Sequence, residues 1–174
     1  STLLGLGTIP IHHELSLGMG GMHGSYASNM ALTEADFILN IGARFDDRLT
    51  GRVNSFAVNT TVAHIDVDPA EIGKVIKTAI PVVGDAKKTL EMLLRFDQVE
   101  TDYADWTAQV LENKRRAPFG YEPDETYVKP QEVIEIIGEL TEGEAIVITD
   151  VGQHQMWTAQ YYPFKNGRQL ITSG

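Results

Sequence analysis

The sequence has 174 residues, of which 43% are hydrophobic and 22% are charged, values that are typical of a folded globular protein. Its formal net charge of −10 argues against non-specific binding to nucleic acids or anionic membranes, which requires a basic surface. The absence of cysteine excludes disulfides, thiolate metal ligands and cysteine nucleophiles, and with no segment apolar enough to span a membrane we expect a cytoplasmic protein.

A glycine-rich segment over residues 18–24 is the first feature along the chain. It departs from the Gly-x-Gly-x-x-Gly pattern of dinucleotide-binding turns, because His23 stands in place of the third glycine and no strand precedes it. An ordinary flexible turn is therefore an equal alternative. Ser25 is a suitable N-cap for a helix predicted over residues 26–35, and the N-terminus of that helix suits a phosphate or a flavin oxygen.

Three short apolar runs with β-prone residues follow, and each ends at a glycine or an aspartate. They predict strands over residues 37–41, 61–67 and 80–83. Helices are predicted over residues 69–76, with Asp68 as N-cap, and after Asp85. Strands that alternate with short helices predict an α/β fold with a Rossmann-like parallel sheet and flanking helices. We expect residues 37–41 to form a central, buried strand of that sheet.

The composition changes near residue 97, where the sequence predicts a surface helix followed by an extended linker. A second unit is predicted from residue 129. It consists of a helix that carries Val133 and Ile137, a buried strand over residues 145–149, a helix that starts near Gln153, and a strand over residues 170–172. The predicted domains are therefore 1–96, 97–128 and 129–174, and the last contains the first βα elements of a second α/β domain.

The charged segment over residues 42–48 comes directly after the first predicted strand. In open α/β sheets, ligands bind beyond the carboxyl ends of the strands. Gly42 allows the backbone to approach a ligand, and arginines such as Arg44 can clamp phosphates. A salt-bridge cluster on the surface is the alternative. The position behind a strand favours a ligand-facing loop.

Two further groups of polar residues follow strands. His64, Asp66 and Asp68 have the spacing of metal ligands, but strand alternation puts them on one face without further ligands, and a strand-end acid more often binds a ribose hydroxyl or caps a helix. Gln153 and His154 are donors at a strand-to-helix turn, where they suit a diphosphate, although a structural role is the alternative. No catalytic triad, carboxylate pair or Walker loop is present. The sequence thus predicts binding residues without a catalytic centre.

Four motifs together resemble the catalytic (large) subunit of the acetohydroxyacid synthases, also called acetolactate synthases. They lie at residues 21–24, 42–48, 64–68 and 151–157, in the order and at the spacing of the family, across essentially the whole chain. The resemblance implies a thiamine-diphosphate enzyme with an N-terminal pyrimidine-binding domain, an FAD-binding middle domain and a C-terminal diphosphate-binding domain. Such an enzyme decarboxylates pyruvate and joins the hydroxyethyl unit to pyruvate or 2-ketobutyrate in branched-chain amino acid biosynthesis.

The same resemblance implies FAD, thiamine diphosphate and Mg²⁺ as cofactors, a homodimer or homotetramer of catalytic subunits, and a regulatory small subunit. It assigns Asp66 to a ribose hydroxyl and Arg44 to the polar part of the flavin nucleotide. Met22, Asp47 and Arg48 resemble residues of the substrate channel. The residues implied to bind cofactors are Gly20, Gly21, Met22, His23, Gly42, Ala43, Arg44, Phe45, Asp46, Asp66, Val67, Asp85 and Ala86 for FAD, and Gln153 and His154 for thiamine diphosphate.

The family's catalytic glutamate, its magnesium motif and the opening strand of its middle domain have no counterpart in the sequence. No catalytic residue and no metal ligand is therefore assigned. Because the chain starts at Ser1 and Gly174 directly follows a strand, we expect a fragment with an incomplete middle domain and no activity of its own. The alternatives are a stand-alone nucleotide-binding module and another thiamine-diphosphate enzyme such as pyruvate oxidase.

Overall fold

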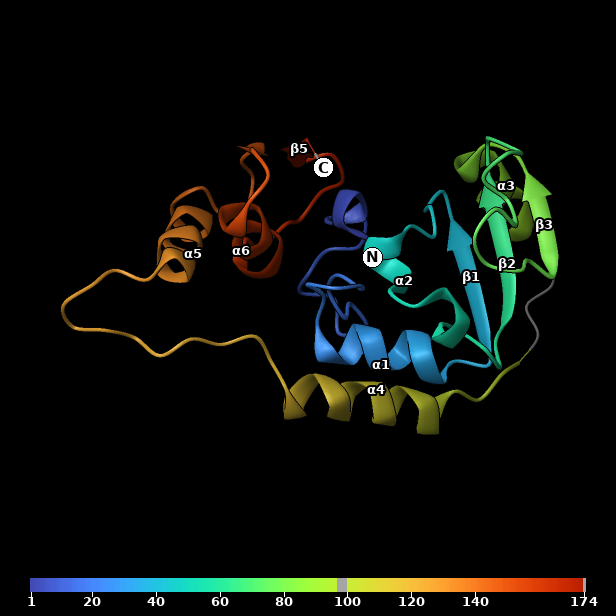
Figure 1. Cartoon of the computed structure of the whole chain (residues 1–174), viewed down its shortest axis with the longest axis horizontal. Coiled ribbons are helices and arrows are strands. Elements are labelled where there is room, and N and C mark those ends of the chain that lie inside the picture. Colours follow the sequence, from blue (N-terminus) through green and yellow to red (C-terminus); the bar gives the residue numbers. More distant parts are fainter. Residues whose placement is uncertain (97–99, 174) are drawn as a thin grey trace. The chain divides into compact units, whose positions relative to one another are not determined.

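The computed structural model describes residues 1–96 and 100–173. The chain forms two compact units: unit 1 comprises Ser1–Met30 and Thr107–Gly174, and unit 2 comprises Ala31–Trp106. The boundaries between the units fall inside helices α1 (Tyr26–Glu34) and α4 (Ala104–Arg116) (Figure 1). The predicted domains 1–96, 97–128 and 129–174 are segments of sequence rather than these spatial groups, and they stay a prediction. Residues 97–99, where the predicted linker begins, and Gly174 lie outside the described residues.

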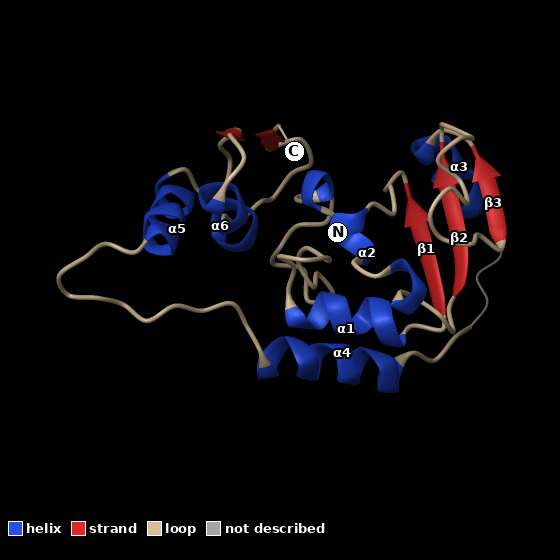
Figure 2. Cartoon of the chain, viewed as in Figure 1, coloured by secondary structure: helices blue, strands red, loops and turns tan. Residues whose placement is uncertain are grey.

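Unit 2 contains a parallel sheet of three strands, β1 (Phe37–Ile41), β2 (Thr61–Asp66) and β3 (Ile80–Val83), in the order β1-β2-β3. The strands lie side by side in Figure 2, and Phe37 is in register with Thr61 and Ala63 with Ile80. The pairing continues beyond β1, where the Gly42 N–H donates to the Ile65 carbonyl at 2.8 Å. The parallel α/β fold and the positions of all three strands are thus confirmed, β2 ending one residue before its predicted end.

The prediction that residues 37–41 form a central, buried strand is wrong. Among the described strands, β1 pairs only with β2, and its Phe37 and Leu39 side chains are 49% and 44% exposed. The centre of the sheet is β2, where Val62 and Ile65 are each 1% exposed. A short apolar run has the same sequence pattern at the edge and in the centre of a sheet, because the pattern does not indicate how many strands pair with it.

The core of unit 2 forms between β2 and the segment that follows β1. Phe45, Val62 and Ile76 are its buried residues, and half-buried Ile38, Leu49 and Phe56 pack against them. Phe45 stacks edge-on against Phe56, with ring centroids 5.9 Å apart. The short helices α2 (Asp47–Thr50) and η2 (Val53–Ser55) belong to the same segment. Burial of Phe45, worth about 1.5–3 kcal/mol for a side chain of this kind, anchors the charged loop to the sheet.

Of the two helices predicted in unit 2, one forms and one does not. Helix α3 (Ala86–Leu93) begins after Asp85, whose carboxylate accepts a hydrogen bond from the Lys88 N–H at 2.9 Å, as expected of an N-cap. The helix predicted over residues 69–76 is wrong, because this segment is a series of turns. Asp68 does accept from the Ala70 N–H at 2.9 Å, but Gly73 adopts a φ of +71°, which ends any right-handed helix before its second turn.

Unit 1 contains the predicted elements α5 (Pro130–Leu140), β4 (Val147–Thr149), α6 (Gln153–Tyr161) and β5 (Leu170–Thr172), and parts of α1 and α4. It also contains the short helix η1 (Leu3–Gly5), which the sequence did not predict. Strands β4 and β5 pair in parallel, with Val147 opposite Leu170. Helix α1 ends one residue before the predicted position. The prediction of a buried strand over residues 145–149 is wrong in two respects: β4 is shorter, and Ile148 is 73% exposed because no described segment covers that face.

The core of unit 1 joins the N-terminal segment to α6 and β5. Its buried residues are Leu6, Met19, Ala159, Tyr162, Phe164 and Leu170. Buried Gln169 connects the loops around this core: its Nε2 donates to the Gly143 carbonyl at 2.7 Å, and its Oε1 accepts from the Asn166 N–H at 2.7 Å. All polar atoms of this side chain thus have partners, as a buried amide requires.

Candidate functional site

The carboxyl ends of β1, β2 and β3 carry most of the residues predicted to bind a ligand. Because the strands are parallel, the segments that follow them lie at one edge of the sheet (Figure 1). The predicted site residues at this edge are Gly42, Ala43, Arg44, Phe45, Asp46, Asp47 and Arg48 after β1, Asp66 and Val67 at the end of β2, and Asp85 and Ala86 after β3. The topology of unit 2 therefore gathers eleven of the predicted residues, which three separate segments of the sequence supply.

The loop after β1 is held by its own polar contacts. Gly42 adopts a φ of +63° with open space around its Cα, so its conformation, and not a lack of room, favours glycine there. Buried Asn40 donates to the Ala43 carbonyl at 2.6 Å. Asp46 caps α2 by accepting from the Leu49 N–H at 3.1 Å. The loop thus enters the site in one defined conformation.

The four charged side chains of this loop, Arg44, Asp46, Asp47 and Arg48, are all exposed. Within the described residues, no ion pair involves any of them. The alternative of a salt-bridge cluster on the surface therefore has no support from the geometry. An exposed guanidinium at a strand end can form bidentate hydrogen bonds to an anionic group such as a phosphate.

Asp66 is the buried carboxylate of this edge, with 8% of the residue exposed. Its Oδ1 accepts from the Asp68 N–H at 2.8 Å, and its Oδ2 lies 3.7 Å from the Nε2 atom of His64. Next to it, Val67 is 74% exposed. Asp85 is exposed and its carboxylate caps α3. Asp66 therefore presents a carboxylate at the centre of the sheet edge, as ribose recognition requires.

In unit 1, the glycine-rich segment forms a tightly held loop. Gly20 and Gly21 are buried, whereas Met22 and His23 are exposed. The Gly21 N–H donates to Asn29 Oδ1 at 2.8 Å, and the Gly21 carbonyl accepts from Asn29 Nδ2 at 2.9 Å. Two hydrogen bonds to one side chain of α1 thus hold the turn.

Ser25 is confirmed as the N-cap of α1, because its Oγ accepts from the Ser28 N–H at 3.0 Å. The same hydroxyl donates to the Leu17 carbonyl. Asn29 is a residue that sequence reasoning missed. The signal for it is an asparagine in the first turns of a helix, at a position where its amide can reach back to the preceding loop.

Gln153 and His154 are the first residues of α6 after β4, and both are exposed. Gly152 precedes them and provides no side-chain cap, so the first N–H groups of this helix have no side-chain acceptor there. Such a helix start suits an anionic ligand. Sequence reasoning missed Gln155, a buried residue whose Nε2 donates to Thr172 Oγ1 at 2.7 Å and so connects α6 to β5.

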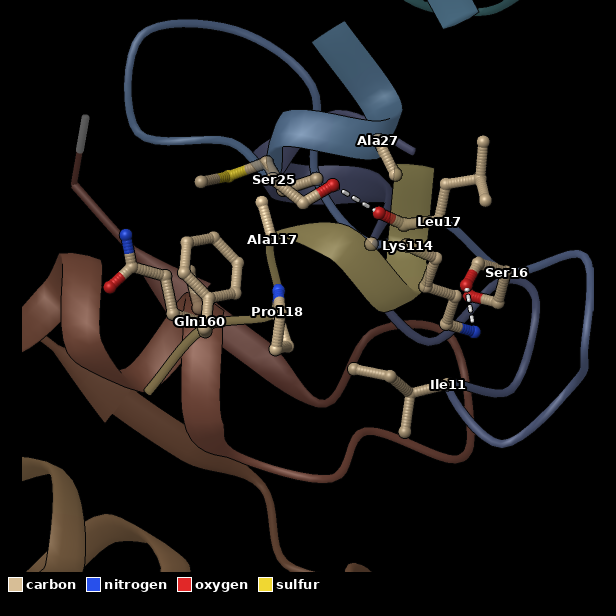
Figure 3. A pocket seen from close by; sticks show the side chains of 13 residues that line it. Ile11, Ser16, Leu17, Ser25, Ala27, Lys114, Ala117, Pro118 and Gln160 are labelled. Atoms are coloured by element: carbon tan, nitrogen blue, oxygen red, sulfur yellow. Dashed lines mark hydrogen bonds between the residues drawn. The ribbon is translucent and has the colours of Figure 1, made fainter. Parts of the chain in front are cut away.

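A mainly apolar pocket of about 160 Å³ lies within unit 1 (Figure 3). It is lined by Ile11, Ser16, Leu17, Gly18, Met19, Ser25, Ala27, Lys114, Ala117, Pro118, Phe119, Ala159 and Gln160. Its one cationic group, the Lys114 ammonium, donates to the Ser16 and Glu14 carbonyls at 2.8 and 3.3 Å. None of the residues predicted to bind a cofactor or substrate lines this pocket.

Residues 1–96 and 100–173 contain neither a metal-binding cluster of side chains nor a membrane-spanning helix. No group of three or more histidine, aspartate and glutamate side chains in these ranges could hold a metal ion. In the same ranges, no helix is long and apolar enough to cross a membrane.

Comparison with known proteins gives matches over the whole chain. Residues 1–93 match the family model described as the thiamine pyrophosphate enzyme central domain. The acetolactate synthase large subunit of Lactococcus lactis subsp. lactis (strain IL1403) is 62% identical over 174 residues, which are 100% of this chain and 30% of that protein.

Two further relatives match at lower identity. Acetolactate synthase isozyme 3 large subunit of Escherichia coli (strain K12) is 44% identical over 99% of this chain and 31% of that protein. Acetolactate synthase 1, chloroplastic, of Zea mays is 42% identical over 99% of this chain and 28% of that protein. The chain therefore spans about 30% of the length of the curated relatives it matches.

Proposed function

Because this chain belongs to the thiamine pyrophosphate enzymes, whose central domain its residues 1–93 match, we propose that it is part of an acetolactate synthase catalytic subunit. In this proposal the carboxyl edge of unit 2 holds one part of the FAD site. The start of α6 in unit 1 faces the diphosphate of thiamine diphosphate. The whole subunit is an enzyme, and the chain alone is inactive.

One observation carries the proposal. The parallel sheet of unit 2 gathers residues 42–48, Asp66 and Asp85 at one edge, in a chain that is 62% identical over its full length to a protein named acetolactate synthase large subunit. A nucleotide needs a carboxylate for its ribose, a cation for its phosphates and backbone that can approach it closely. Asp66, Arg44 and Gly42 supply these three features at this edge.

Each predicted residue has a role that fits its surroundings. Asp66 accepts a hydrogen bond from a ribose hydroxyl, and Arg44 pairs with the nucleotide phosphates. These two contacts are surrounded by the other residues assigned to FAD at this edge, which are Gly42, Ala43, Phe45, Asp46, Val67, Asp85 and Ala86. In the whole subunit, Gly20, Gly21, Met22 and His23 of the glycine-rich loop are also assigned to FAD.

The remaining assignments concern substrate and the second cofactor. In the whole subunit, Met22, Asp47 and Arg48 are assigned to the substrate channel. Gln153 and His154 donate hydrogen bonds to the diphosphate of thiamine diphosphate, where the start of α6 favours negative charge. When bound, thiamine diphosphate supplies the carbanion chemistry by which a 2-ketoacid loses carbon dioxide. Mg²⁺ belongs to the whole subunit, and we assign it no ligand among the described residues.

The proposal extends to the whole protein. Its substrates are pyruvate and 2-ketobutyrate, its products feed branched-chain amino acid biosynthesis, and it works as a homodimer or homotetramer of catalytic subunits with a regulatory small subunit. We place it in the cytoplasm, while the name of the maize relative places that protein in the chloroplast. The relatives do not favour the two alternatives, a stand-alone nucleotide-binding module and pyruvate oxidase.

A chimera tests the proposal directly. In the Lactococcus relative, the aligned 30% of the protein is replaced by this chain. We expect the chimera to form acetolactate from pyruvate and to bind one FAD per subunit. A matched chimera that carries Asp66→Ala should bind FAD about tenfold or more weakly, because the lost hydrogen bond involves a charged group. A folded chimera that forms no acetolactate would overturn the proposal.

The isolated chain provides the complementary test. With thiamine diphosphate, Mg²⁺, FAD and pyruvate, we expect no acetolactate, because the catalytic glutamate of the family has no counterpart in the sequence. We also expect FAD to bind weakly or not at all. Measurable turnover would contradict the inactivity of the chain, and a tight stoichiometric flavin complex would contradict an incomplete site.

A further inference from the structure

His64 is a buried side chain that none of the roles above uses. It lies in the central strand β2, and the residue is 0% exposed. Both of its ring nitrogens are buried and have no hydrogen-bond partner among the described residues. Buried polar groups in native proteins nearly always have partners, so an imidazole in this state calls for a physical explanation.

Two neighbours define the surroundings of this imidazole. The Phe45 ring meets it edge-on, with ring centroids 5.5 Å apart and an angle of 86° between the planes. On the carboxyl side, Asp66 Oδ2 lies 3.7 Å from Nε2. Phe45 belongs to the loop after β1, and Asp66 ends β2. One ring thus contacts both the loop that carries Arg44 and the carboxylate proposed to bind ribose.

We propose that His64 is a positioning residue that orients the Asp66 carboxylate for a ribose hydroxyl and supports the Phe45 loop beside it. The inference rests on the proposed flavin-nucleotide site. The Asp68 N–H already binds Oδ1 of Asp66. A second contact, from His64 to Oδ2, would fix the orientation of the whole carboxylate. The separation of 3.7 Å exceeds a hydrogen bond by well under 1 Å. Hydrogen bonds in functional sites are often long without ligand and shorten in the complex.

The proposed contact defines the state of the imidazole. To donate to the carboxylate, a neutral His64 must carry its proton on Nε2 and leave Nδ1 without one. Nδ1 then remains a buried acceptor without a hydrogen-bond partner among the described residues. The proposed contact therefore accounts for Nε2 and specifies one tautomer.

The first experiment needs no ligand. Nitrogen-15 spectra of the imidazole in the isolated chain should show the proton of neutral His64 on Nε2. Asp66→Asn should shift the Nε2 resonance of His64, whereas Asp68→Asn, which alters a neighbouring exposed carboxylate, should leave it unchanged. A proton on Nδ1, or an Nε2 resonance that Asp66→Asn does not move, would overturn the proposal.

The second experiment measures the affinity for FAD of the chimera with the Lactococcus relative, because the isolated chain is expected to bind FAD weakly or not at all. His64→Phe keeps a ring against Phe45 but removes both nitrogens. We expect His64→Phe and Asp66→Asn each to weaken FAD binding about tenfold, and the double variant to be no weaker than either single variant. His64→Gln, which restores a donor, should recover part of the affinity. Thermal unfolding of each variant shows whether the fold is retained.

The outcomes separate the two proposals. If Asp66→Asn weakens FAD binding and His64→Phe does not, or if their effects add, the positioning role is wrong and the nucleotide site stands. If Asp66→Asn leaves the affinity of the chimera for FAD unchanged, or the parent chimera binds no FAD, the proposed nucleotide site is wrong, and the imidazole spectra decide whether His64 orients Asp66. If His64→Phe unfolds the chain, the FAD affinity of His64→Gln and the imidazole spectra decide whether His64 orients Asp66.

Discussion

The side-chain amide of Asn40 donates a 2.6 Å hydrogen bond to the carbonyl of Ala43, three residues further along the chain. Asn40 is 8% exposed and belongs to β1, whereas Ala43 lies in the loop that follows. The contact joins the conformation of the loop to the strand before it. It is therefore part of what holds the proposed ligand-facing residues in place.

Asn40→Leu removes this contact at similar volume. The carbonyl of Ala43 loses its partner, so the free energy of unfolding should fall by about 1–3 kcal/mol. Urea unfolding followed by circular dichroism measures the change. Exposed Asn59 is the matched control, and Asn59→Ala should change stability by less than about 0.5 kcal/mol. Equal stability of the Asn40 and Asn59 variants would show that the contact does not hold the loop.

Gly24→Ala should destabilise the glycine-rich loop of unit 1. A Cβ atom at this position would lie 2.3 Å from the Met19 carbonyl oxygen and 2.7 Å from the Gly20 carbonyl carbon, and both are backbone atoms that cannot rotate away. We expect a loss of about 3 kcal/mol, at the upper end for overpacking, seen as a lower Tm. Gly120→Ala is the control, because nothing lies within 4 Å of its Cβ position. If the Gly24→Ala variant has the same Tm as the Gly120→Ala variant, this description of the packing is wrong.

Asp85 allows its capping role to be separated from its predicted cofactor role. Asp85→Ala removes the acceptor for the Lys88 N–H and should cost about 1 kcal/mol of stability. Asp85→Asn keeps a capping oxygen and should cost only a few tenths of a kcal/mol. Chemical denaturation of both variants makes the comparison. The cap assignment fails if the two substitutions cost the same.

Tyr121 should titrate at unusually high pH. A hydrogen bond of 2.6 Å to Glu135 Oε2 is the main cause that raises the pKa of Tyr121 to about 12. Because the folded-state pKa lies above the ordinary value near 10, the stabilising effect is complete below about pH 10 and is lost as the pH rises toward 12. The sequence has six tyrosines, so the tyrosinate absorbance of Tyr121→Phe is subtracted from that of the parent chain.

Glu135→Gln is the control for this titration. It removes the negative charge and weakens the hydrogen bond, so the pKa of Tyr121 should move back toward its ordinary value. The pKa of Tyr161, which burial and then the Glu135 charge raise, should fall as well. A difference titration unchanged by Glu135→Gln would show that another group sets the pKa of Tyr121.

Local patterns in the sequence were sufficient to predict most of the secondary-structure elements of this protein. Apolar runs and capping residues that lie within a few positions of one another predicted strands β1, β2 and β3, a helix after Asp85 and the cap of α1 by Ser25. The motifs after the strands also predicted which residues meet at the carboxyl edge, because parallel strands direct their following loops to one side. Hydrogen bonds and steric limits within a short segment are sufficient for such predictions.

Which residues are buried, and which residues pair across long distances in the sequence, became known from the folded chain. The fold placed β1 at an edge of the described sheet, left Ile148 exposed, put Asn29 against Gly21, and enclosed His64 between Phe45 and Asp66. The turns over residues 69–76 show the same limit, since one glycine conformation outweighed the local helix signals there. Burial and long-range pairing depend on segments that lie far apart in the chain, so no local pattern contains them.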